Sequence, residues 1–67
     1  MKEFGEKLKD LRIEKGLTQK QLAEQIGSAQ ASIFYWETNQ REPSISALKS
    51  LCLFFDVSSD YLLGLEK

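Results

Sequence analysis

The 67-residue chain lacks histidine, has a single cysteine and a single proline, and contains no apolar run long enough to cross a bilayer. Without histidine it has neither the commonest general base nor the commonest metal ligand, and Cys52 alone cannot form an internal disulfide. It also lacks a glycine-rich phosphate loop, metal-ligand spacing and a signal-peptide pattern. We therefore expect no enzyme, cofactor, metal, small-molecule substrate or membrane association, and a reducing, cytoplasmic location.

Basic charge is also scarce, since the formal net charge is −1. Residues 1–20 carry a net charge of +2 and residues 21–67 a net charge of −3. The chain is not a general polycation, so its non-specific affinity for nucleic acid should be weak. Any binding to DNA must depend on a few well-placed groups and on pairing of two copies.

Hydrophobic periodicity predicts one all-α domain, residues 1–67, built from five helices without a strand. The first helix runs from about Glu3 to Lys15, with an apolar face, and ends at Gly16. Thr18 and Gln21 form a capping-box pattern at the start of the second helix.

The remaining boundaries follow from the same signals. Gly27 ends the second helix, Ser28 caps the third, and the third runs to Glu37. A polar loop over residues 38–43 precedes the fourth helix, which starts at Ser44 or Ser46, and Ser58 or Ser59 caps the fifth. The apolar stripe of the fourth helix includes Leu48, Leu51, Cys52 and Phe55.

Residues 18–37 thus predict a helix, a tight turn and a second helix, a helix-turn-helix whose second helix can lie in the DNA major groove. Periodicity assigns Ala29, Ile33 and Trp36 to the core face, and Gln30, Ala31, Phe34 and Tyr35 to other faces. The Gln30 amide can pair with adenine, and Ala31 or Tyr35 can contact a thymine methyl group. Phe34 and Tyr35 are both candidates for contact with the bases; alternatively, they belong to the core or to a protein interface.

Candidate phosphate contacts flank this helix. Gln19 lies beside the free N–H groups at the start of the second helix, and Lys20 adds a positive charge. Asn39, Gln40 and Arg41 follow the third helix and are placed to contact the DNA backbone on its other side. The alternative is that these are ordinary polar surface residues.

The full set of motifs resembles the lambda-repressor-like, Cro-type helix-turn-helix family, also called the xenobiotic response element family. The matching residues are Leu17-Thr18-Gln19-x-x-Leu22-Ala23-x-x-Ile26-Gly27, Ile33-x-x-Trp36-Glu37, Pro43, Leu48-x-x-Leu51 and Val57-Ser58-x-Asp60-Tyr61-Leu62-Leu63-Gly64. The resemblance implies a compact five-helix DNA-binding domain of the kind found in phage and bacterial transcription regulators.

By the same resemblance, Gln19 contacts phosphate, and residues 39–41 lie on the DNA backbone. Ala29, Gln30, Ala31 and Tyr35 face the bases. Arg12 and Glu37, at the ends of the first and third helices, are expected to form a structural ion pair.

Three apolar residues near the C-terminus, Leu53, Phe54 and Leu65, do not all fit one small core. The family usually has a polar residue at the place of Leu53 and a small one at Phe54. We therefore expect this surface to form a symmetric homodimer, with Phe54 packing over the fifth helix as the alternative.

The sequence favours a regulator, expected to be a repressor, that binds a palindromic double-stranded DNA operator as a dimer. A protein-interaction module on the same fold, of antirepressor or antitoxin-like type, is the alternative. Net acidity and the apolar side chains of Phe34 and Tyr35 favour that second hypothesis.

Overall fold

The computed structural model describes residues 2–66, and all regular structure within this range is helical. Five helices follow one another along the chain: α1 (Lys2–Glu14), α2 (Gln19–Ile26), α3 (Gln30–Glu37), α4 (Ile45–Phe55) and α5 (Ser59–Leu62). The predicted all-α, five-helix architecture is confirmed.

The helix ends follow from local capping chemistry. Thr18 Oγ1 accepts the Gln21 N–H at 3.0 Å, and Gln21 Oε1 accepts the Thr18 N–H at 2.9 Å, which completes the capping box. Gly27 ends α2 with a φ of 70°, in the left-handed region that glycine occupies without steric cost. The hydroxyls of Ser44 and Ser58 cap α4 and α5.

The prediction that Ser28 caps α3 is wrong. The Ser28 N–H donates to the Ala23 carbonyl at 2.9 Å, so Ser28 still belongs to the C-terminal turn of α2. Ala29 is the N-cap instead, with an extended backbone (φ −87°, ψ 150°) and no side-chain capping bond. Helical periodicity does not apply to a residue outside the helix, and the Ala29 side chain is exposed rather than in the core.

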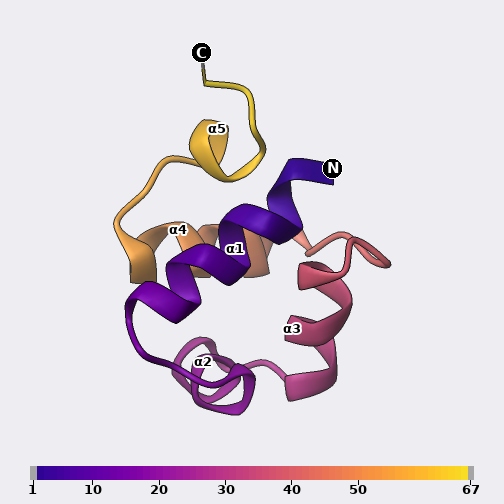
Figure 1. Ribbon diagram of the computed structural model, residues 1–67, viewed down its shortest axis with the longest axis vertical. Helices are drawn as coiled ribbons and strands as arrows, with labels where there is room; N and C mark the ends of the chain where they lie inside the picture. The colour runs from indigo at the N-terminus through magenta and orange to yellow at the C-terminus, as the bar shows by residue number, and fades with distance from the viewer. Residues whose placement is uncertain (1, 67) are drawn as a thin grey trace.

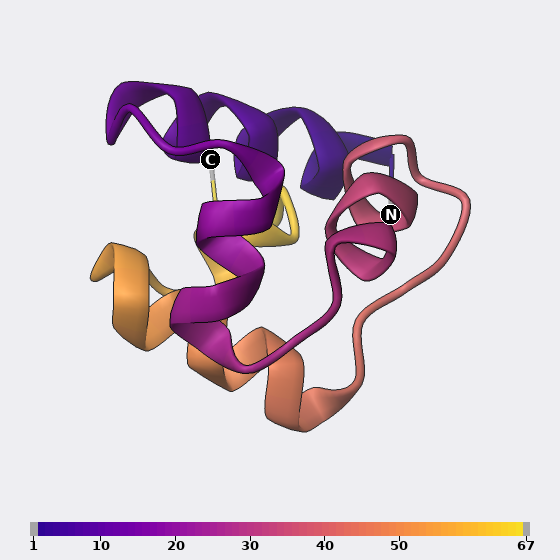
Figure 2. The ribbon, with the colours of Figure 1, turned by 90° about the horizontal axis from the view of Figure 1, so that it is seen from below.

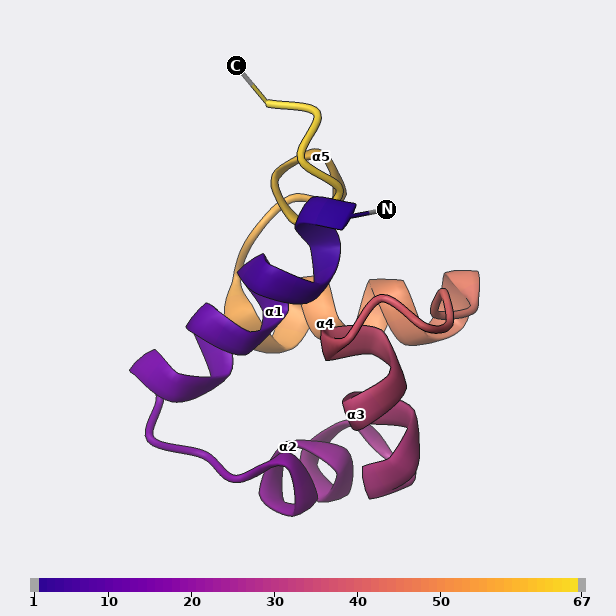
Figure 3. The same ribbon diagram turned by 45° about the vertical axis from the view of Figure 1, so that its right-hand side comes forward.

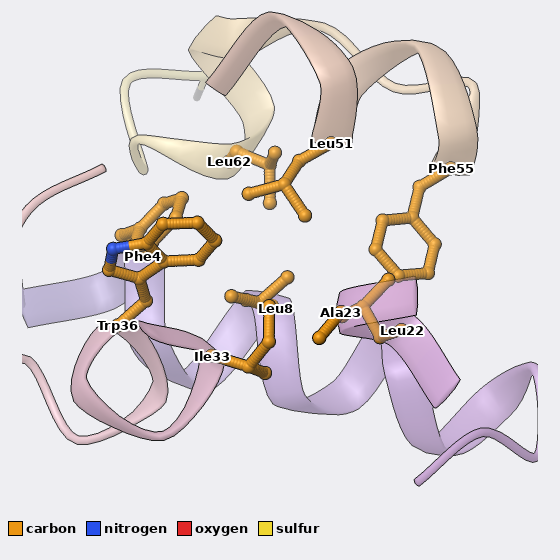
Figure 4. Close-up of a cluster of buried hydrophobic side chains, with 9 residues drawn as sticks. All are labelled: Phe4, Leu8, Leu22, Ala23, Ile33, Trp36, Leu51, Phe55 and Leu62. Atoms are coloured by element: carbon orange, nitrogen blue, oxygen red, sulfur yellow. The ribbon is translucent and has the colours of Figure 1, made fainter. Parts of the chain in front are cut away.

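All five helices contribute side chains to one core (Figure 4). The buried apolar residues are Phe4, Leu8, Leu22, Ala23, Ile33, Trp36, Leu51, Phe55 and Leu62. Burying a large aliphatic or aromatic side chain stabilises a fold by about 1.5–3 kcal/mol. Cys52 is half-buried and packs against this core, as expected for a small apolar residue.

α2 and α3 form one end of the molecule (Figures 1 and 3). α2 and α3 pack against each other at that end, while α5 lies at the opposite end against α1 and α4 (Figures 1 and 3). Seen from the α2 end, α1 and α4 lie on either side of α2, with α3 beside it (Figure 2). None of the helices within residues 2–66 combines the length and apolarity needed to cross a membrane.

Candidate nucleic-acid interface

The start of α2 and the outer face of α3 together line a hollow of about 320 Å³. Its lining consists entirely of predicted site residues: Gln19, Gln30, Ala31, Phe34 and Tyr35. Phe34 is 45% exposed and Tyr35 is half-buried, and both lie outside the core cluster. The hollow therefore presents amide, methyl and aromatic groups, and none of its side chains is charged.

A buried ion pair joins α1 to α3, and a hydrogen bond from Gln19 links the start of α2 to the same carboxylate. Glu37 accepts hydrogen bonds from Arg12 Nε at 2.6 Å, from Arg12 Nη2 at 3.0 Å and from Gln19 Nε2 at 3.2 Å. Arg12 Nη1 also donates to the Leu17 carbonyl at 2.8 Å. The side chains of Arg12 and Glu37 are only 12% and 3% exposed. The structure thus brings the two residues of the expected ion pair together.

This network has two consequences for the interface. The hydrogen bonds to Glu37 raise the pKa of Arg12 above its usual value, so the guanidinium stays charged. The link from Glu37 to Gln19, which sequence reasoning missed, holds the Gln19 side chain at the hollow. Because an amide nitrogen carries two N–H donors, Gln19 keeps one donor and its oxygen for a ligand.

Lys20 follows Gln19 in the first turn of α2, and its side chain is exposed. The capping box uses the N–H groups of Thr18 and Gln21. The backbone N–H groups of Gln19 and Lys20 have no partner within the helix, because they belong to its first turn. This end of α2 therefore offers donors and a positive charge together.

The Asn39 side chain makes a hydrogen bond that joins the loop after α3 to α1. The φ of Asn39, 59°, lies in the left-handed region, and its Oδ1 accepts the Gly5 N–H at 3.1 Å. A Cβ at Gly5 would lie 2.5 Å from the Glu37 carbonyl oxygen, so α1 approaches the end of α3 closely. Sequence reasoning missed this approach, and it turns the Asn39 oxygen toward α1 rather than toward a candidate backbone contact.

Gln40 and Arg41 fold back on α3. Their N–H groups both donate to the Tyr35 carbonyl, at 2.9 and 3.3 Å. Gln40 Nε2 donates to Thr38 Oγ1 at 2.9 Å. The Arg41 guanidinium lies over the Tyr35 ring, 4.5 Å from its centroid. Arg41 is therefore held beside the hollow, with its charge exposed to solvent.

The proposed dimer residues differ in exposure. Leu53 and Leu65 are 73% and 67% exposed. Phe54 is half-buried, meets the Phe55 ring edge-on at 5.0 Å, and has Lys15 Nζ 5.1 Å from its ring centroid. Phe54 therefore contributes mainly to its own fold, and Leu53 and Leu65 are the members available to a partner.

Sequence reasoning also missed Ile45, which is 88% exposed on the first turn of α4. Ile45 borders an apolar groove of about 400 Å³ whose lining includes Leu48, Cys52 and Val57. Burial raises the pKa of the Cys52 thiol, so the thiolate is disfavoured. Within residues 2–66, no group of three or more Cys, Asp and Glu side chains is placed to hold a metal ion.

The matching family model is described as helix-turn-helix and covers residues 8–62. The HTH-type transcriptional activator BcrR of Enterococcus faecalis is 45% identical over 65 residues, which cover 97% of this chain and 32% of BcrR. The HTH-type transcriptional regulator ImmR of Bacillus subtilis is 35% identical over 64 residues, or 96% of this chain and 50% of ImmR. PlcR of Bacillus thuringiensis, solved in complex with the peptide PapR7 and DNA, superposes with a TM-score of 0.85 and 26% identity, covering 97% of this chain and 23% of PlcR.

The chain spans about a third to a half of the length of these two curated relatives. Both relatives are named as transcriptional regulators, in agreement with the expectation that the chain is not an enzyme. The match of the family model over most of the chain confirms the family that the motifs predicted. The chain belongs to the Cro/C1-type helix-turn-helix family.

Proposed function

We propose that this chain is the sequence-specific DNA-binding domain of a transcriptional regulator. α3 enters the major groove, and the start of α2 contacts the phosphate backbone. The observation that carries the proposal is the uncharged hollow shared by these helices, at the end of the molecule that α2 and α3 form. PlcR, which has the same fold, was solved with DNA, and this supports the proposal.

The roles of the residues follow from their chemistry. Gln30 pairs with adenine, while Ala31, Phe34 and Tyr35 contact thymine methyl groups or base edges. Ala29, exposed at the N-cap of α3, adds a further apolar contact.

The phosphate contacts come from both sides of α3. Gln19, Lys20 and the first N–H groups of α2 contact phosphate on one side. Gln40 and Arg41 contact the backbone on the other side. Asn39 acts on this contact indirectly, because its side chain holds the loop against α1.

The domain binds a palindromic operator as a two-fold dimer, which places two copies of α3 about 34 Å apart. Leu53 and Leu65, with the groove beside Ile45, supply the apolar contact surface. When such a dimer is bound to an operator in the bacterial cytoplasm, it represses transcription by excluding RNA polymerase from the promoter. BcrR is named as an activator, so a reporter gene placed behind the selected operator must establish the sign of regulation.

Selection of bound duplexes from a random-sequence pool tests DNA recognition. The expected result is a palindrome with half-sites one helical turn apart. Gln30→Ala should then cost about 1–3 kcal/mol at one base pair of each half-site. The matched control is Gln25→Ala, which removes an exposed amide from α2 outside the hollow. No enrichment at low salt, or an equal loss on every sequence, would contradict the proposal.

Sedimentation at several concentrations tests the dimer. Leu53→Lys should weaken self-association without changing the helical circular dichroism spectrum. Ile13→Lys, at a residue 55% exposed on α1, introduces the same charge elsewhere and should leave self-association unchanged. Equal masses for both variants and the parent at every concentration would exclude this surface.

A protein-interaction module is the second candidate function. The exposed, uncharged side chain of Phe34 and the net charge of −1 favour it. This candidate predicts no sequence enrichment in the same selection.

A further inference from the structure

We propose that the apolar groove between α4 and the start of α5 binds a free carboxylate that carries an aliphatic chain of medium length. The groove has a volume of about 400 Å³, at the low end of the range of about 300–1,000 Å³ typical of small-molecule sites. It is separate from the hollow of α2 and α3, because no residue lines both. The inference therefore does not depend on the proposed binding of DNA.

The groove has an apolar floor beside an exposed rim. Leu48, Cys52 and Val57 are half-buried and pack against the core, so they form the floor. Ile45 and Lys49, one helical turn apart on α4, form the rim, and Ile45 is 88% exposed. From Ile45 to Cys52 the helix rises by about 10 Å, which is the length of an extended octanoyl chain. A chain lying along this floor covers apolar surface that otherwise contacts water.

The turn that ends α4 holds the opposite wall of the groove in place. Asp56 has a left-handed backbone with a φ of 55°, and the Val57 N–H donates to the Cys52 carbonyl at 3.0 Å. The Ser58 hydroxyl caps α5 and also donates to Glu66. The wall is therefore formed before a ligand arrives, and binding avoids most of the cost of ordering it.

The charge of the lining selects the head group of the ligand. Of the described residues that line the groove, only Lys49 is charged, and none is acidic or aromatic. Lys49 makes no ion pair within residues 2–66. Asp56 and Asp60 flank the opposite wall in sequence, but they do not line the groove and are exposed to screening by solvent. A carboxylate beside Lys49, with its chain on the floor, matches both the charge and the apolar surface.

Titration of the isotope-labelled protein with butanoate, hexanoate, octanoate and decanoate, below the concentrations at which they form micelles, tests the proposal by NMR. Amide shifts should change at Cys52 and Val57 and stay unchanged at Gln30, in the hollow. Each added methylene group should strengthen binding by about two- to fourfold until the groove is filled, after which the affinity should level off.

Two pairs of variants at exposed positions separate the contributions of charge and of apolar contact. Lys49→Gln should weaken octanoate binding by about two- to fivefold and leave octanol binding unchanged, whereas Lys9→Gln, on α1, should alter neither. Ile45→Ser should weaken the binding of octanoate and octanol alike, by about fourfold or more. Ile13→Ser, at a residue 55% exposed on α1, is its matched control.

The proposed dimer places the same groove against a second copy, so the ligand and that copy compete for it. Amide shifts that follow protein concentration and do not respond to octanoate overturn the proposal, because a second copy then fills the groove. Affinity that keeps rising through decanoate, or that is unchanged in Lys49→Gln, also overturns it. Each of these results leaves the proposed DNA-binding function standing, and a failed selection for DNA leaves this site standing.

Discussion

Glu37→Gln tests how much the buried ion pair between Arg12 of α1 and Glu37 of α3 stabilises the domain. The substitution keeps the shape of the side chain and one acceptor oxygen, but it removes the negative charge. Arg12 then remains largely buried without a counter-ion, since its side chain is 12% exposed. Within residues 2–66, its guanidinium donates one other hydrogen bond, to the Leu17 carbonyl at 2.8 Å.

The magnitude follows from the bonds lost. Removing one partner of a buried ion pair costs about 3–5 kcal/mol, because the remaining ion is desolvated without compensation. Arg12 keeps some exposure to water and one hydrogen bond, so we expect a loss of about 3 kcal/mol, at the low end of this range. A 67-residue domain has a total stability of about 3–10 kcal/mol. The substitution therefore removes a large part of the stability.

Urea unfolding followed by circular dichroism at 222 nm measures this loss. With an m-value of about 1 kcal/mol/M, the midpoint should fall by about 3 M. Glu24→Gln, the same change at an exposed position of α2, should stay within about 0.5 kcal/mol of the parent.

The double substitution Arg12→Met with Glu37→Leu provides a second control. It leaves no unpaired ion, so it should be clearly more stable than Glu37→Gln alone. Gln19 loses its acceptor at residue 37 in the double variant, whereas Glu37→Gln keeps one amide oxygen, so the comparison understates the gain from removing the unpaired ion. A loss below about 1 kcal/mol for Glu37→Gln, or a double variant that is no more stable, would refute the reasoning.

Three further predictions concern local contacts. Gly5→Ala should lower the free energy of unfolding by about 1–2 kcal/mol, because the new Cβ lies 2.8 Å or less from the carbonyl oxygens of Trp36 and Glu37. Urea unfolding measures this loss, and an unchanged midpoint would contradict the close approach. Asn39→Ala should have a Tm about 4–8 °C lower than that of Asn39→Gly. Both variants lose the hydrogen bond to Gly5, but only alanine is strained at a φ of 59°, so equal Tm values would contradict this reasoning. At pH 8, Cys52 should react with a thiol reagent more slowly in the folded than in the unfolded protein, because burial raises its pKa and less thiolate is present; equal rates would contradict this.

Features set by neighbouring residues could be predicted from the sequence. The capping box of Thr18 and Gln21 and the left-handed turn at Gly27 depend on contacts within a few residues, and both appear as expected. The apolar stripes also located most of the core, because helical periodicity carries through each helix interior. For the same reason, periodicity identified the outer face of α3, where Gln30, Ala31 and Phe34 are exposed.

Two kinds of feature could not be predicted in the same way: a residue suited to either of two helices, and a contact between residues far apart in the sequence. Ser28 is equally suited to end α2 or to begin α3, and only the backbone bond to Ala23 decides between them. The contacts of Gly5 with Asn39 and of Gln19 with Glu37 join residues 34 and 18 positions apart. No local pattern marks such pairs, although an unexplained glycine within a helix is a signal of close approach.

The salt dependence of DNA binding is our last prediction, and it follows from the scarcity of cations. Residues 19–43, which include α2, α3 and the loop after them, contain two cations, Lys20 and Arg41. Each neutralised phosphate contributes about −0.9 to the slope of log K against log salt concentration. We expect a slope of about −2 for one domain and about −4 for a two-fold dimer.

Lys20→Gln should make the slope shallower by about 0.9 per domain, whereas Lys9→Gln, on the exposed side of α1, should leave it unchanged. An equal change from both variants would show that general charge attracts the DNA rather than the start of α2. With so little binding energy from phosphate, affinity for unrelated sequences must be low. Uncharged groups at the hollow then supply most of the discrimination, so the ratio of specific to non-specific affinity should change little with salt.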